Sequence, residues 1–123
     1  MIIFKNFKAD GIHFFTDGKQ NLEMAYMKHP SGHIIKPHKH LQIKRVTKNT
    51  QEILFVKSGK VKVDFYYNEK TFVKSKELNG GDWLILFAGG HGFEILKPAI
   101  LYEIKQGPYA GDQDKFRFDP IKT

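Results

Sequence analysis

The stretch "EILFVKSGKVKVDFYY", residues 52–67, decides the fold class of this chain. Its first five residues form a nearly continuous apolar run, which is typical of a strand covered on both faces. The sequence "KSGK" is a turn signal, and after it apolar and polar residues alternate. A period of two residues predicts β-strands. The apolar face of the second strand is expected to carry Val61, Val63, Phe65 and Tyr67.

The same pattern recurs elsewhere in the chain. Strands are predicted over residues 82–87 and 99–106, and also over 21–29, where Leu, Glu, Met and Ala would suit a helix as well;. Turn signals such as "HPSG", "LNGGD" and "AGGHG" separate the apolar runs;. We find no long amphipathic helix and no internal repeat. These observations predict an all-β barrel or sandwich. The length of 123 residues favours a single domain over 1–123, with an irregular C-terminal tail over 109–123;.

The composition excludes several kinds of chemistry. The chain has no cysteine, so disulfides, thiolate metal sites and a cysteine nucleophile are impossible;. The net charge of +7 comes mainly from lysines, with arginine only at Arg45 and Arg117. Since base readout favours arginine, we expect no nucleic-acid partner. The N-terminal apolar run "MIIF" is too short for a signal peptide or a membrane span, so we expect a cytoplasmic protein without membrane contact;.

Three histidines fall within "GHIIKPHKH", residues 32–40. On a strand, His38 and His40 would point to the same face about 6.6 Å apart, so both imidazoles could bind one metal ion. An exposed histidine patch is the alternative. Glu52 shares a strand face with Leu54 and Val56, so an inward face would bury its carboxylate. A carboxylate at the solvent end of the strand is the other interpretation. His91, which lies among glycines, is either a ligand or a loop residue.

The spacing G-x5-H-x-H…E-x6-G over residues 32–59, followed by a second block over 81–95, resembles the motifs of the cupin superfamily. The resemblance implies a double-stranded β-helix, which is the jelly-roll or cupin barrel. It also implies a divalent metal ion, and Fe, Mn, Ni, Zn and Co all suit histidine and carboxylate ligands. The metal ligands implied by the resemblance are His38, His40, Glu52 and His91.

The chain departs from the family pattern at several positions. Eleven residues separate His40 from Glu52, where the family has three or four. This implies a longer loop beside the barrel mouth, and Gln51 or His33 remains open as a replacement for Glu52. Strand parity, however, places His33 on the face opposite His38. Phe87 takes the place of the proline in the second motif.

Side chains on strands that border the cavity are candidates for substrate binding: Lys36, Tyr26, Tyr102, Glu103 and Gln106. Tyr102 and Glu103 face opposite ways on a strand, so at most one of them can line the cavity. Lys36 shares a face with His38 and His40 and could hold an anionic group.

The resemblance implies a metal-dependent protein that acts on a small polar molecule. The chain looks most similar to small single-domain cupins of sugar isomerisation and epimerisation and of surface polysaccharide biosynthesis. A phosphorylated or nucleotide-linked sugar would suit the lysine-rich segment. An Fe(II)-dependent dioxygenase and a non-catalytic small-ligand-binding module are the alternatives. The resemblance also implies a homodimer formed through exposed strand edges.

Overall fold

The computed structural model describes residues 1–121, and its regular structure is almost all β, with 46% of residues in strands and one short 3-10 helix. The chain divides into two compact units. One unit comprises Met1–Asn6 and the chain from Asn49 onward, and the other comprises Phe7–Lys48. We refer to them as the sheet unit and the hairpin unit and describe each by itself.

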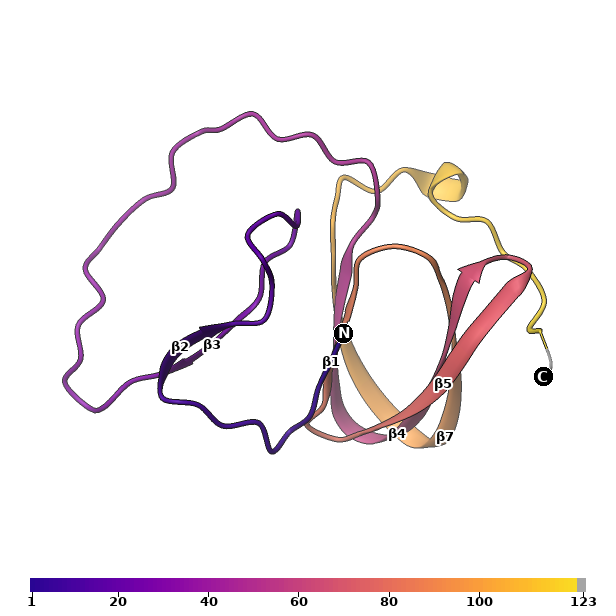
Figure 1. Cartoon of the computed structure of the whole chain (residues 1–123), viewed down its shortest axis with the longest axis horizontal. Coiled ribbons are helices and arrows are strands. Elements are labelled where there is room, and N and C mark those ends of the chain that lie inside the picture. Colours follow the sequence, from indigo (N-terminus) through magenta and orange to yellow (C-terminus); the bar gives the residue numbers. More distant parts are fainter. Residues whose placement is uncertain (122–123) are drawn as a thin grey trace. The chain divides into compact units, whose positions relative to one another are not determined.

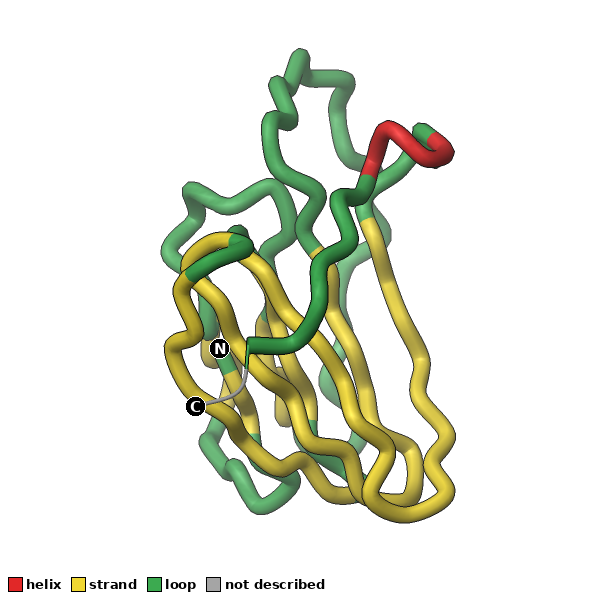
Figure 2. Tube along the Cα trace, turned by 90° about the vertical axis from the view of Figure 1, so that its right-hand side faces the viewer, coloured by secondary structure: helices red, strands yellow, loops and turns green. Residues whose placement is uncertain are grey.

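The sheet unit is one antiparallel sheet built around a long central strand, β4, which spans Glu52–Asn68. Strand β7, Gly90–Lys105, pairs with β4 from Glu52 to Tyr66. On the other edge of β4, β6 (Trp83–Leu86) pairs with the first part and β5 (Thr71–Asn79) with the second. Strand β1, Ile2–Ile3, pairs with β6. In Figure 2 the longer strands of this sheet run side by side as curved tubes.

Strands β4 and β7 curl together into a half-barrel, as Figure 1 shows. Their register shifts between Val56 and Val61, which indicates β-bulges at the centre of the ladder. A bulge bends the strand and increases its twist, and it therefore favours the curl. The turn predicted at "KSGK" is wrong, because this segment lies inside a continuous strand. The structure shows this half-barrel, and the double-stranded β-helix stays a prediction.

The core lies on the concave face of the half-barrel. Its buried cluster contains residues from both halves of β4 and from β5 and β6: Leu54, Val56, Val63, Leu78, Leu84 and Leu86. The predicted burial of Val61 and Val63 is confirmed. For Tyr67 the prediction is wrong, because this residue is 77% exposed and Tyr66 is 6% exposed. The rings of Phe72 and Phe118 pack against the ring of Tyr66, with centroid distances of 5.7 and 5.1 Å. These contacts explain the burial of Tyr66.

The C-terminal segment contains a single turn of 3-10 helix, η1, at Gly111–Asp114. The Thr50 hydroxyl donates a hydrogen bond to the Asp114 carboxylate, and Phe118 packs on Tyr66. Residues 122 and 123 of the predicted tail lie outside the described residues. Within residues 1–121, no helix has the length and apolar character needed to cross a membrane.

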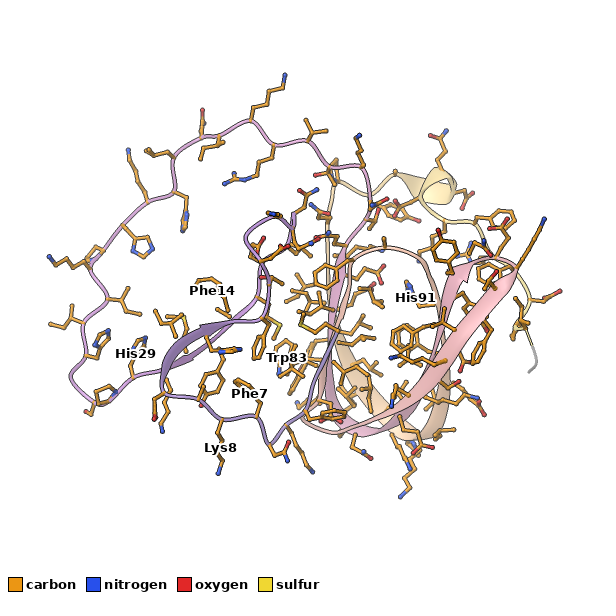
Figure 3. All side chains as sticks on the ribbon, in the orientation of Figure 1. Phe7, Lys8, Phe14, His29, Trp83 and His91 are labelled. Atoms are coloured by element: carbon orange, nitrogen blue, oxygen red, sulfur yellow. The ribbon has the colours of Figure 1, made fainter. Side chains whose placement is uncertain are left out.

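The hairpin unit contains two short antiparallel strands, β2 (Gly11–Phe14) and β3 (Ala25–Lys28). Its aromatic cluster has ring centroids 4.8–5.3 Å apart and consists of Phe7, His13, Phe15 and Tyr26. Figure 3 shows Phe7 and Phe14 on opposite sides of the hairpin ribbon. The strand predicted over residues 21–29 is present but shorter, because β3 spans only Ala25–Lys28.

The strand expected around His38 and His40 is not formed. Residues 33–48 contain neither helix nor strand, and all of their side chains are exposed. A strand requires a neighbouring strand to satisfy its backbone groups, and alternation of side chains alone does not supply one. Pro37 also lacks an N–H donor. The spacing of His38 and His40 therefore does not correspond to a strand.

Candidate functional site

Glu52 and His91 meet on the concave face of the sheet unit. Glu52 begins β4 and pairs with Lys105, whereas His91 pairs with Phe65 near the far end of β4. In a straight strand, positions 52 and 65 would be about 40 Å apart. Because the strands curl, His91 Nε2 lies 3.3 Å from Glu52 Oε2. Figure 3 shows His91 on the concave side of the curled strands.

Glu52 is 8% exposed and shares its face with buried Leu54 and Val56, so the predicted inward face is confirmed. The hydrogen bond that His91 donates lowers the pKa of Glu52. Burial of the carboxylate opposes this effect, and the nearby charges of His91 and Lys105 reinforce it;. Glu52 is therefore held in its ionised form beside an imidazole.

The separation of the two side chains fits the donor set of a divalent metal ion. Two ligands that each lie about 2.1 Å from one ion are about 3.0–3.4 Å apart at octahedral and tetrahedral angles. The distance of 3.3 Å between His91 Nε2 and Glu52 Oε2 is within this range. One nitrogen and one carboxylate oxygen are borderline-to-hard donors, which suit Zn, Fe, Mn, Ni and Co.

His38 and His40 form a second pair, in the hairpin unit. Their ring centroids are 5.5 Å apart, and both residues are exposed. His38 Nδ1 lies 2.8 Å from the Lys36 carbonyl oxygen. Because a carbonyl oxygen only accepts hydrogen bonds, Nδ1–H is the donor and Nε2 carries the free lone pair. A backbone carbonyl on the second nitrogen is the usual partner of a metal-binding histidine.

The four predicted ligands thus form two pairs, one in each unit. In the part of the chain that the structure describes, no three histidine, aspartate or glutamate side chains gather as a metal-binding group. The metal-ligand roles of His38, His40, Glu52 and His91 stay predictions. His33, which strand parity separated from His38, stacks on His29 with ring centroids 4.1 Å apart.

The candidates for substrate binding are also divided between the units. Glu103 and Tyr102 lie on opposite faces of β7, as predicted, with Glu103 on the concave face beside Glu52. Gln106 follows β7, and its side chain accepts a hydrogen bond from the backbone N–H of Gln51. In the hairpin unit, Tyr26 packs against Phe7 and Lys36 is exposed.

Two further residues border the Glu52–His91 pair and were not identified from the sequence. The Phe93 ring lies 5.6 Å from the His91 ring on the same strand face and is 40% exposed. Lys105 lies opposite Glu52 and contributes positive charge. The signal for Phe93 was its i+2 spacing from His91, which places both side chains on one face of a strand. No comparable local signal identified Lys105.

In comparisons with known proteins, no family model matches this chain, and neither does a curated protein or a solved structure. The functional interpretation therefore depends on the residues and on their geometry.

Proposed function

We propose that this chain is a cupin-type double-stranded β-helix that binds a divalent metal ion and acts on a small sugar-derived molecule as an isomerase or epimerase. The observation that carries the proposal is the Glu52–His91 pair, with Nε2 and Oε2 3.3 Å apart on the concave face of a curled sheet. The half-barrel of the sheet unit and the spacing of the two sequence blocks support the same conclusion.

The residues of the pair have complementary chemistry. As metal ligands, the ionised Glu52 and the imidazole of His91 would hold the ion, and the neighbouring Glu103 carboxylate on the same face would accept the proton;. Isomerisation of a sugar next to a carbonyl group requires removal of a proton from one carbon and delivery of a proton to another atom. When bound to its predicted ligands, a metal ion would polarise the carbonyl oxygen of the substrate.

The side chains around the pair suit a molecule with both apolar and anionic parts. Phe93 presents a partly exposed ring beside His91, and Lys105 places a positive charge near Glu52. A site with one aromatic surface and a few charged groups is typical of small-molecule binding. A phosphorylated or nucleotide-linked sugar combines a ring with a negatively charged group.

Elemental analysis of the purified protein tests the metal site. We expect about one divalent ion per chain in the wild type, and strong loss of metal in both His38→Ala and His91→Ala. The matched control is His13→Ala, because His13 lies on β2 outside the predicted ligand set. Full metal retention in His38→Ala and His91→Ala would contradict the proposed centre. Loss of metal in His91→Ala but not in His38→Ala would exclude His38 from the proposed metal centre.

A turnover screen tests the reaction. Metal-loaded protein is incubated with sugar phosphates and nucleotide-linked keto sugars, and proton exchange with deuterated water is followed by NMR. We expect exchange at the carbon next to the carbonyl group, and at least a hundredfold loss in Glu52→Gln. Iron-dependent oxygen uptake without isomerisation would support the dioxygenase instead. Absence of both activities and of binding would contradict the proposal.

A further inference from the structure

A lysine of β5 continues the row of side chains that carries His91 across the sheet unit. In the antiparallel pairing of the three strands, Phe65 of β4 lies opposite Lys74 of β5 on one side and opposite His91 of β7 on the other. Residues that lie directly opposite each other on antiparallel strands point to the same face of the sheet. Lys74 therefore shares the concave face with His91.

The next row along the sheet has the same arrangement. Val63, which is fully buried in the core, lies opposite Lys76 of β5 and opposite Phe93 of β7. Lys74 and Lys76 are two residues apart on one strand, so their side chains point the same way about 6.8 Å apart. Both are exposed. We refer to Lys74 and Lys76 as the β5 lysines.

The β5 lysines differ from the lysines on the opposite face of β4, because those have carboxylate partners. On the convex face Lys60 pairs with Glu77, and Lys62 pairs with Glu94. Within residues 1–121, neither of the β5 lysines forms an ion pair with a carboxylate. Two neighbouring positive charges without a counter-charge repel each other, and an anion bound between them would relieve this repulsion.

The separation of the β5 lysines from the Glu52–His91 pair suits a small molecule. Adjacent strands lie about 4.8 Å apart, so the two steps from β5 across β4 to β7 span about 10 Å. Between Lys74 and His91 lies Phe65, which is partly buried and packs against the core. A ligand with its ring over Phe65 would place one end at the β5 lysines and the other at the Glu52–His91 pair.

We propose that Lys74 and Lys76 bind the phosphoryl group of a small ligand whose ring lies over Phe65 and points toward His91. A phosphoryl group carries about −1.5 to −2 charges at pH 7, which matches two ammonium groups, and charge-assisted hydrogen bonds to it are strong. That this ligand is the substrate rests on the proposed function. The phosphoryl site itself requires neither the metal ion nor the activity, because the β5 lysines lie outside the predicted ligand set.

Calorimetric titration of metal-free protein with inorganic phosphate and inorganic pyrophosphate at low ionic strength tests the site. In the double variant Lys74→Ala/Lys76→Ala, we expect at least about tenfold weaker binding than in the wild type. The matched control is Lys60→Ala/Lys62→Ala, which removes the same charge from the convex face and should weaken binding at most about twofold;. Tighter binding of pyrophosphate would support a diphosphate-linked ligand, and tighter binding of phosphate a monoester.

Steady-state kinetics separates this inference from the proposed function. With a phosphorylated sugar that is turned over, Lys74→Ala/Lys76→Ala should raise KM at least about tenfold and leave kcat within about threefold, because the lysines bind a group that does not react. Phosphate binding without isomerase activity would contradict the proposed function but not the site.

Two results overturn the phosphoryl site. One is a wild type that binds neither phosphate nor pyrophosphate. The other is equal weakening of binding in the two double variants, which would show that only the net charge matters. Circular dichroism of both double variants checks that they are folded, and their substituted side chains lie at the surface of the sheet unit rather than in its core.

Discussion

Glu52 illustrates how much of a residue's role depends on its partner. Its position at the start of an apolar run predicted a carboxylate on an inward face, and its low exposure confirms that face. The partner that makes this burial tolerable is His91, 39 positions further along the chain, because a buried carboxylate needs a hydrogen-bond donor or an opposite charge;. Local sequence shows the need for a partner, and only the fold supplies it.

The lowered pKa of Glu52 predicts how stability depends on pH. A carboxylate with a depressed folded-state pKa contributes stability above its unfolded pKa, and this contribution is lost as the pH falls through the folded pKa. In metal-free protein, Glu52→Gln should lower the free energy of unfolding by about 1–2 kcal/mol at pH 6, because it replaces a charged hydrogen-bond acceptor with a neutral one.

Urea unfolding of wild type and Glu52→Gln between pH 6 and pH 3 measures this difference. Below an ordinary glutamate pKa of about 4.3 the difference should shrink progressively, since the wild-type carboxyl becomes protonated as well. Comparison with the variant cancels the titration of groups that do not interact with Glu52. A difference that stays constant across the whole range would show that Glu52 does not titrate as inferred.

Strand β4 is the element in which local and long-range preferences disagree. Its sequence predicts two strands joined by a turn at "KSGK", and the structure contains one bulged strand. Gly59 has a φ of +92°, which is a conformation that glycine adopts readily, and so the local turn signal was physically sound;. Continuous pairing with β7 on both sides of Gly59 converts the bend into a bulge within the ladder;.

Gly59→Ala should therefore destabilise the sheet unit strongly. A Cβ atom at this position would lie 2.2 Å from the Pro98 carbonyl oxygen, and the positive φ alone costs about 1–3 kcal/mol;. We expect a loss of at least about 2 kcal/mol in the free energy of unfolding, measured by denaturant titration.

Gly92→Ala is the matched control on β7, because a Cβ atom there meets nothing within 4 Å and its φ is not positive. Its effect should stay within about 1 kcal/mol. Equal effects of the two substitutions would indicate that the close approach of Gly59 to β7 is not required.

At the scale of the whole molecule, the two units each hold one pair of the predicted metal ligands. The segment that carries His38 and His40 has neither helix nor strand and contains Lys39, Lys44 and Arg45, all exposed. An exposed segment without regular hydrogen bonding is a preferred site of proteolysis. Metal binding by the two histidines would fix this segment and reduce its susceptibility to cleavage.

Limited trypsin digestion tests this consequence of the proposed function. Without metal, the first cuts should fall between residues 39 and 48, as identified by mass spectrometry;. Addition of Zn²⁺ or Ni²⁺ should slow these cuts about tenfold or more in the wild type but not in His38→Ala. Equal protection of both proteins would exclude His38 from the metal site.

By itself, the sequence determined the all-β class, the burial of Val61 and Val63 and the inward face of Glu52. These features depend on the alternation of neighbouring residues, which side-chain geometry fixes locally. Only the tertiary structure decided that β4 is one strand, that residues 33–48 form none, and that Glu52 lies beside His91. The physical reason is that strand pairing and curl depend on hydrogen bonds and packing between residues far apart in the chain, which no local pattern encodes.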